Sequence, residues 1–518
     1  MWLSSPNICG NGNSEDMDAP LKEIVIAGGG SAGWMTAAAL SSLLEPRNVT
    51  IKLVESDEIG TIGVGEATIP DIINFNHLLG LNEAEFMKAT QATFKLGIEF
   101  IDWGRRGDSY IHPFSVHGVD MKGIDFHQYW LHDRAGGSRH PIQHFSLCSI
   151  AATQGKFTLP VADPRSVLSF VRYAYHFDAS LYAKYLRGYA EARGVRRIEG
   201  KIQDVTQSPE SGRITALKLT GGQEVSGDFF FDCTGFRAML LEKVLGVPYV
   251  DWSHWLPCNS AQAVPCRHAG PLLPYTRSTA RTAGWQWRIP TQHRTGNGHI
   301  YSREFMSDDE AAAILLANLD GEAMAAPRQI RFTAGRRQEF WSRNCIAIGL
   351  SAGFLEPLES TSIYLIQEGI SRFISLFPDA SLPEVVRDEY NRHMSREFEQ
   401  VRDFIILHYF ATERDDTPFW NYCRNMSIPD SLRHRFELFR EAGRVFRYDE
   451  ELFARPSWVA VFLGQNILPR RCDPIVAALP HAEVRLSLES MHAAMLAATQ
   501  AMPTHAEFIH RYCPADSG

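Results

Sequence analysis

The first pattern along the chain is a short apolar run, a glycine-rich turn and a second apolar run. Residues 22–27 (KEIVIA) are typical of a buried strand, residues 28–44 (GGGSAGWMTAAALSSLL) of a tight turn entering a helix, and residues 49–56 (VTIKLVES) of another strand. Strand and helix patterns continue to alternate up to about residue 250. This order predicts an α/β fold.

Two later segments repeat the pattern of a strand that runs into a turn, at 224–237 (EVSGDFFFDCTGFR) and 343–361 (RNCIAIGLSAGFLEPLEST). A helix follows the second, because its apolar residues recur with a period near 3.6: Ile363, Ile366, Ile370, Phe373, Ile374 and Phe377.

Strand signals fade after about residue 385, and the stretches 384–410 and 431–446 have helical patterns. We therefore predict an α/β (α+β) core over 21–384 and a mostly helical subdomain over 385–512. Residues 1–20 have neither a basic nor an apolar segment of a signal peptide and are predicted to be a disordered tail.

Composition narrows the class of protein. The chain has 518 residues, 45% of them apolar, and a net charge of −9, which gives no basic surface for nucleic acid or an anionic membrane. Nine cysteines without CxxC pairs argue against a disulfide framework or a zinc site, so we expect no metal. No apolar run reaches the roughly 20 residues of a membrane span. We predict a soluble, cytoplasmic protein.

The glycine-rich turn carries a dinucleotide-binding fingerprint, Gly28-x-Gly30-x-x-Gly33. Gly28 permits the tight turn, Gly30 lets a pyrophosphate approach the backbone, and Gly33 lets helix and strand pack closely. The pyrophosphate would lie at the helix start, where unpaired amides favour an anion. Ser31 and Ala32, at the helix start, are further predicted contacts. Glu55, at the end of the second strand, is predicted to bind a ribose hydroxyl. The alternative is a glycine-rich loop that merely turns.

The fingerprint does not separate NAD from FAD, but later segments favour FAD. GVGEATIP (63–70), DCTGFR (232–237) and the segment 344–361 look like the additional flavin contacts of p-hydroxybenzoate-hydroxylase-type flavoproteins. By this likeness the further cofactor-binding residues are Ala67, Ile202, Leu350 and Ile363. No second fingerprint for NAD(P)H is visible, so reduced FAD would have to come from a separate flavin reductase.

A tryptophan pair is the most distinctive motif, Trp285-Gln286-Trp287-Arg288-Ile289-Pro290. The two tryptophans point the same way from an extended backbone; alone, such a stretch is usually a strand with bulky core residues. This WxWxIP pattern resembles that of the flavin-dependent tryptophan halogenases. The resemblance covers roughly residues 20–500 through GGGSAGW, GVGEATIP, ATFKLGIEFIDW, DCTGFR, GWQWRIP and FLEPLESTSIY, in that order.

The resemblance implies a chemistry. Reduced FAD, O2 and chloride or bromide would produce hypohalous acid, which travels through a tunnel to a lysine beside an electron-rich aromatic substrate, here expected to be an indole. In ATFKLGIEF the apolar Phe94, Leu96, Ile98 and Phe100 alternate with Lys95, so the pattern alone predicts a lysine on a solvated strand face. The match to the family's FK makes Lys95 the catalytic lysine, either polarising hypohalous acid as an ammonium or forming a haloamine as an amine.

By the same resemblance Glu359 is the second catalytic residue, a carboxylate that stabilises the cationic ring and accepts its proton. It lies among apolar neighbours, so any charge there would be poorly solvated. Glu356 is the competing choice, with a structural carboxylate that binds backbone amides as its alternative role.

The family also implies halide and substrate sites. Thr361 and Ser362 begin a helix whose amides would bind the halide, although the family pattern has glycine where this chain has Ser362, and an ordinary Ser/Thr helix cap is the alternative. His112 and Phe114 match positions that flank the indole, and the remaining predicted substrate contacts are Ser360 and Trp458. Trp458 stands where tryptophan halogenases have Tyr-Tyr, so we expect free L-tryptophan to be a poor substrate.

Two other functions share these sequence features. A flavin monooxygenase that hydroxylates an aromatic ring would have the same fold, and a flavin-binding redox protein without turnover would keep the fingerprint. The expected partners are a flavin reductase and a small aromatic substrate, without nucleic acid or membrane. A homodimer is retained as one option for the oligomeric state.

Overall fold

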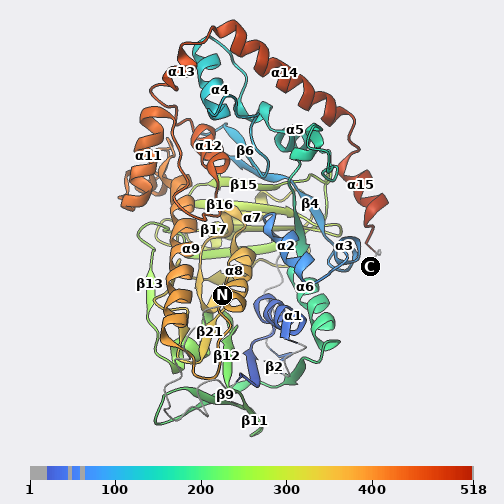
Figure 1. The fold of residues 1–518 in the computed structure, drawn as a ribbon, viewed down its shortest axis with the longest axis vertical. Coiled ribbons are helices and arrows are strands. Elements are labelled where there is room, and N and C mark those ends of the chain that lie inside the picture. The colour runs from blue at the N-terminus through green and yellow to red at the C-terminus, as the bar shows by residue number, and fades with distance from the viewer. Residues whose placement is uncertain (1–19, 45–48, 59–64, 516–518) are drawn as a thin grey trace, which may run out of the picture.

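The computed structural model describes residues 20–44, 49–58 and 65–515. The predicted tail lies outside these ranges except for its last residue. A six-stranded sheet lies at the bottom of Figure 1, a seven-stranded sheet crosses its middle, and C-terminal helices cover the top. The predicted α/β class is confirmed.

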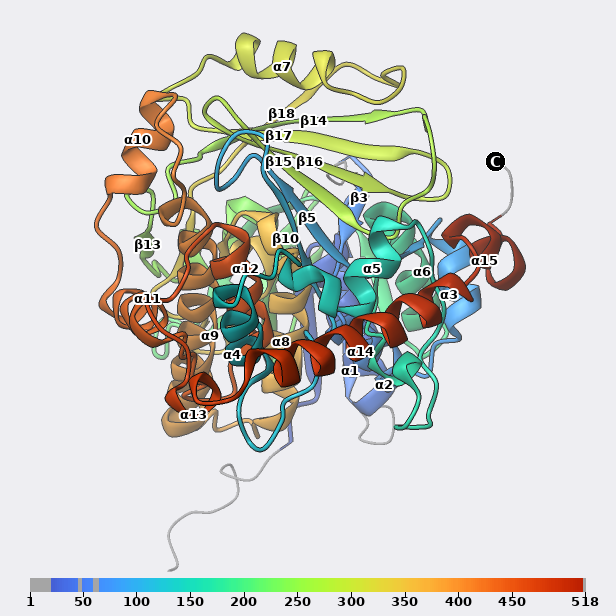
Figure 2. The same ribbon diagram turned by 90° about the horizontal axis from the view of Figure 1, so that it is seen from above.

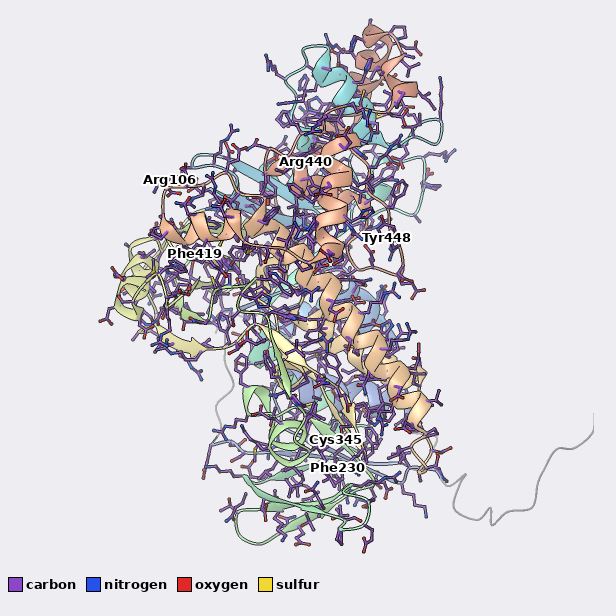
Figure 3. The ribbon with its side chains drawn as sticks, turned by 90° about the vertical axis from the view of Figure 1, so that its left-hand side faces the viewer. Arg106, Phe230, Cys345, Phe419, Arg440 and Tyr448 are labelled. Carbon is purple, nitrogen blue, oxygen red and sulfur yellow. The ribbon has the colours of Figure 1, made fainter. Side chains whose placement is uncertain are left out.

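The six-stranded sheet is the dinucleotide-binding part of the fold. Its order is β20 (Trp341–Ser342), β21 (Cys345–Ala347), β12 (Phe229–Asp232), β1 (Glu23–Ala27), β2 (Thr50–Glu55) and β8 (Arg196–Glu199). All neighbours from β21 to β8 are parallel. Figure 3 shows one such register pair, Phe230 and Cys345, side by side. Helices α1 (Ser31–Leu44), α6 (Ala179–Glu191) and α8 (Ser362–Ser375) pack next to it, with α1 in contact with both others.

The seven-stranded sheet carries the tryptophan pair. Its order is β18 (Arg328–Arg331), β14 (Ser260–Cys266), β17 (Thr295–Tyr301), β16 (Gly284–Pro290), β15 (Thr276–Arg281), β5 (Gly97–Ile101) and β6 (Ser109–Pro113). Only β15 and β5 pair in parallel. The predicted strand at WQWRIP is β16, and helix α7 (Asp308–Ala317) covers β17 and β14.

A three-stranded sheet joins these two parts: β3 (Gly65–Ala67), β7 (Ala174–Asp178) and β4 (Thr93–Lys95). The alternating segment ATFKLGIEF (92–100) does not form one strand, because strand pairing is interrupted at Leu96, whose amide donates to the Pro274 carbonyl at 2.7 Å. Lys95 therefore ends β4, while Glu99 belongs to β5. Lys95 has no exposed surface, so the solvated strand face is wrong as well.

Beyond residue 384 the described chain is helical, as predicted. The long helix α9 (Glu384–Phe410) runs along one flank of the molecule (Figures 1 and 3). Seen from above, α14 (His481–Gln500) crosses the molecule over α4 (Phe126–Ala135) and α5 (Leu147–Thr153) (Figure 2). The others are α10 (Pro418–Asn425), α11 (Asp430–Ala442), α12 (Arg455–Gly464), α13 (Pro474–Ala477) and α15 (His505–Tyr512).

The remaining elements are small. Two helices, α2 (Asp71–Leu78) and α3 (Glu83–Ala89), precede β4, and two three-stranded sheets contain β11 (Glu224–Ser226), β10 (Ile214–Leu219), β9 (Ile202–Gln207) and β13 (Tyr249–Asp251), β19 (Gly335–Arg337), β22 (Gly353–Phe354). Across the described ranges, no helix combines the length and apolar character that crossing a bilayer requires.

Candidate active site

A cavity of about 540 Å3 opens at the carboxyl ends of β1, β2 and β12. Gly28 has φ +108°, and a Cβ there would lie 2.3 Å from the Cys233 carbonyl oxygen. A Cβ on Gly33 would lie 1.8 Å from the Gly28 carbonyl oxygen, so only glycine allows this packing of α1 on β1. At Gly30 no heavy atom lies within 4 Å of the Cβ position. The turn is thus closed behind and open towards the cavity, which fits a pyrophosphate at the start of α1.

The structure brings nearly all predicted cofactor residues to this cavity. Those in its lining are Gly28, Gly30, Ser31, Ala32, Glu55, Ala67, Ile202, Leu350 and Ile363. Gly33 packs behind them. The carboxylate of Glu55 is already held by Arg197 Nε at 2.5 Å and by the Trp34 indole N–H at 3.3 Å, so its contact with a ribose remains a prediction. Glu66, which the sequence reading passed over, also lines the cavity, and burial raises its pKa to about 7.

Lys95 is fully buried beside the cavity. Its ammonium nitrogen donates to the Thr68 carbonyl at 2.9 Å and to Ser360 Oγ at 2.7 Å, and it lies 5.1 Å from the centre of the Phe114 ring. Burial lowers the pKa of Lys95 to about 7, although the charge of Glu359 opposes this. Because Ser360 also lines the large cavity, Lys95 is one side chain away from it.

Glu359 is also buried, at the end of the 3₁₀ turn Pro357–Glu359, and its charge acts on Lys95. Its Oε2 lies 2.8 Å from His112 Nδ1 and its Oε1 lies 2.8 Å from His408 Nε2. Burial by itself raises the pKa of Glu359, but the charge and hydrogen bond of His112, with a contribution from His408, outweigh burial and bring it to about 2. The carboxyl group is therefore held ionised.

Glu356 immediately precedes the same turn and has different partners. Its Oε2 accepts from the Trp285 indole N–H at 2.9 Å and from the Tyr409 hydroxyl at 2.5 Å. Burial raises the pKa of Glu356 to about 7, and the two hydrogen bonds only partly offset it. Glu356 thus connects β16 to α9 through two side-chain donors, not through the backbone amides expected, whereas Glu359 is the carboxylate whose charge acts on Lys95.

The predicted halide residues, Thr361 and Ser362, directly follow Ser360, which lines the large cavity and binds Lys95. Ser362 begins α8 and lines the large cavity, and Thr361 is fully buried. Thr361 makes no side-chain cap hydrogen bond, so the ordinary Ser/Thr cap is wrong. The φ of Ser362 is not positive, whereas that of Ser360 is +61°. Serine at 362 is therefore free of the strain expected where the family has glycine.

The predicted substrate residues are only partly brought together. His112 contacts Glu359 directly, Phe114 lies against Lys95, and Ser360 binds Lys95. Trp458 is separate: its indole N–H donates to the Phe453 carbonyl at 3.1 Å, its ring lies 4.2 Å from the Arg435 guanidinium, and its edge contacts Phe404, which in turn contacts His112. A role for Trp458 in substrate binding stays a prediction.

The described residues therefore place a buried lysine and an ionised buried glutamate beside a dinucleotide cavity. A family model described as Tryptophan halogenase matches residues 23–481. The chain belongs to the tryptophan halogenase family. It is a flavin-dependent halogenase.

Several relatives of this halogenase match over most of their length. Tryptophan 6-halogenase SttH from Streptomyces toxytricini is 37% identical over 482 residues, 88% of this chain and 91% of the relative. Among solved structures, Xcc4156 from Xanthomonas campestris is 49% identical with a TM-score of 0.93, covering 96% of this chain and 100% of that chain. BrvH from Brevundimonas sp. BAL3 is 47% identical with a TM-score of 0.92, covering 95% and 99%. Both are described as flavin-dependent halogenases.

Two residues of the halogenase site escaped the sequence reading, His408 and Tyr409. They are consecutive near the end of α9, and each contacts one glutamate of the 3₁₀ turn. In the sequence they belong to an ordinary helical pattern and no motif marks them. Only the packing of α9 across the turn shows their role.

Proposed function

We propose that this halogenase installs chloride or bromide on an electron-rich arene, specifically an indole, with Lys95 and Glu359 as the catalytic pair. The supporting observation is that the buried Lys95 donates to Ser360, while the preceding residue, Glu359, is buried and ionised and its charge acts on Lys95. FAD would bind in the large cavity; reduced by a separate reductase, it would supply hypohalous acid from O2 and halide.

Lys95 would activate the hypohalous acid in its ammonium form. Its present acceptors, the Thr68 carbonyl and the Ser360 hydroxyl, together with the nearby carboxylate of Glu359, favour that form. An ammonium N–H donating to the oxygen of the acid polarises the O–halogen bond and makes hydroxide a better leaving group. As the carbon–halogen bond forms, the departing oxygen accepts a proton and leaves as water.

Glu359 would take the ring proton. Halogen addition leaves a cationic ring, which the carboxylate stabilises; the C–H bond then breaks, its electron pair returns to the ring, and the proton moves to Glu359. The pKa of about 2 keeps this carboxylate ionised at neutral pH. The reaction balances as arene and hypohalous acid giving haloarene and water.

A second cavity, of about 200 Å3, supports an uncharged substrate. Its apolar lining consists of Val116, Val119, Phe126, Phe170, Pro456 and Val459, and its polar lining includes His117, Asp120 and His127. Arg455 at its edge is committed to Asp120 and Asp125, both at 2.5 Å, and is not available to a substrate carboxylate. We therefore propose a neutral indole derivative and a poor reaction with free L-tryptophan.

Product analysis tests the proposal. The halogenase, with a flavin reductase, FAD, O2, chloride and bromide, is given indole, an uncharged 3-substituted indole and L-tryptophan, and products are identified by mass. We expect halogenated indoles and little halotryptophan. Hydroxylated products without halogen would instead support the aromatic monooxygenase, and flavin binding without any product would support a redox protein.

The cellular setting is also a proposal. The eight described cysteines are all free thiols, seven of them buried, which agrees with a reducing compartment such as the cytoplasm.

A further inference from the structure

His408 is a fully buried histidine that touches the proposed catalytic carboxylate from behind. Its Nε2 lies 2.8 Å from Glu359 Oε1, and its Nδ1 lies 2.9 Å from the carbonyl oxygen of Phe404, one turn earlier in α9. The two ring nitrogens are thus committed to two oxygen atoms, on opposite edges of one ring.

The positions of the protons follow from these contacts. A backbone carbonyl can only accept, so Nδ1 of His408 must carry a hydrogen. The contact between Nε2 and Oε1 also needs a hydrogen, since two lone pairs at this distance would repel. That hydrogen lies between Nε2 and the carboxyl group of Glu359, whose pKa His112 and His408 together lower.

The ring of His408 has little freedom to turn. It lies against Phe100, Trp103 and Phe404, with ring centres 4.8, 6.1 and 5.3 Å away. The carbonyl of His408 also accepts from Gln465 at 3.0 Å. The imidazole is therefore oriented before any substrate arrives, and it fixes the plane of the Glu359 carboxylate.

We propose that His408 is a positioning residue that holds Glu359 ionised and oriented, so that the carboxylate can accept the ring proton. The inference rests on the proposed role of Glu359 as that base. His408 itself does not contact the reacting ring. No oxidant or reductant is involved, because the only step it serves is the transfer of the proton from the ring carbon to the carboxylate.

Two variants separate the hydrogen bond from the packing. His408→Gln keeps an N–H group near the position of Nε2, whereas His408→Phe keeps the ring and removes both nitrogens. With indole, bromide and a reductase, we expect kcat of His408→Phe to fall about 10- to 100-fold and that of His408→Gln to fall less. The kcat of His408→Phe should also gain an acid limb at a pH where the wild type has none, because His112 alone then opposes the effect of burial on Glu359.

His299 provides the matched control. It is also fully buried, and its Nδ1 lies 3.0 Å from the Ala311 carbonyl, but among the described residues it makes no ion pair with a carboxylate, whereas His408 Nε2 lies 2.8 Å from Glu359 Oε1. His299→Phe should cost stability without adding an acid limb. If His408→Phe and His299→Phe give profiles of the same shape, the proposal is wrong.

A second readout needs no turnover. In His408→Phe, the pKa of Glu359 should rise from about 2 towards its unfolded value, because only His112 then opposes burial, so the ionised carboxylate stabilises the fold less than in the wild type. The Tm gap between wild type and His408→Phe should widen as pH rises from about 3 to about 5, and this widening should vanish when both carry Glu359→Gln. A gap independent of pH overturns the inference. Absence of brominated indole from the wild type, with the gap still widening, would refute only the proposed function.

Discussion

Glu356 and Glu359 lie three residues apart in one turn, both buried, yet their pKa values move in opposite directions, to about 7 and about 2. Burial acts on both in the same sense. The difference lies in the partners: Glu356 is bound by a tyrosine hydroxyl and an indole N–H, which are neutral, whereas Glu359 is bound by two imidazoles, which can carry charge. Neutral donors do not offset the desolvation of a carboxylate, but a chargeable partner does.

The comparison separates a structural carboxyl from a chemical one. Glu356 joins the WxWxIP strand to α9, while the charge of Glu359 acts on Lys95. The same helix serves both, since Tyr409 and His408 are consecutive residues of α9. Substitutions at the two glutamates should therefore give different kinds of effect.

The largest effect is expected at Glu359. Glu359→Gln keeps the size and removes the proton acceptor, so kcat for bromination of indole should fall about 10²- to 10⁴-fold. The matched control is Glu356→Gln, which should stay within about threefold of wild type because a neutral side chain already suffices there. Flavin titration should show that both variants bind FAD equally. Equal losses of kcat in the two variants would contradict the distinction between a structural and a catalytic glutamate.

Stability should respond in the opposite order. Glu356→Leu leaves the Trp285 N–H and the Tyr409 hydroxyl buried without their acceptor, which should lower the free energy of unfolding by about 2–3 kcal/mol. Urea denaturation measures this loss. Glu356→Gln is the control, because its amide oxygen can still accept one bond. A Leu variant as stable as wild type would contradict the structural role.

A smaller loss is expected when one donor is removed instead of the acceptor. Tyr409→Phe deletes the hydroxyl that donates to Glu356 and should cost about 1 kcal/mol in the same urea experiment. Its kcat should change little, unlike that of the His408 variants at the neighbouring position.

The mildest test uses pH alone. With the pKa of Lys95 lowered to about 7, the ammonium fraction falls as pH rises through neutrality. If the ammonium activates hypohalous acid, kcat should fall several-fold between about pH 6 and about pH 8. A rise over this range would favour the haloamine route. Lys95→Met should remove the dependence together with bromination.

Much of this site could be predicted from the sequence because it is built from local motifs. The fingerprint glycines, Lys95 and Glu359 lie in short segments whose order alone identifies the family. The sequence could not show that Lys95 is buried, since the break of the strand at Leu96 depends on a hydrogen bond to Pro274. Nor could it show His408, whose partner is 49 residues away in the chain. Trp458 shows the opposite limit. Its position matches a substrate-binding position of the family, but in the structure its ring packs against other aromatic side chains.

The most direct test of this account is the infrared absorption of carboxyl groups at about pH 6, which distinguishes protonated from ionised side chains. The difference spectrum between wild type and Glu356→Gln should contain the C=O band of a protonated carboxyl group. The difference spectrum between wild type and Glu359→Gln should contain carboxylate bands only. If Glu359→Gln loses a protonated carboxyl band, the claim that Glu359 is ionised near Lys95 is wrong.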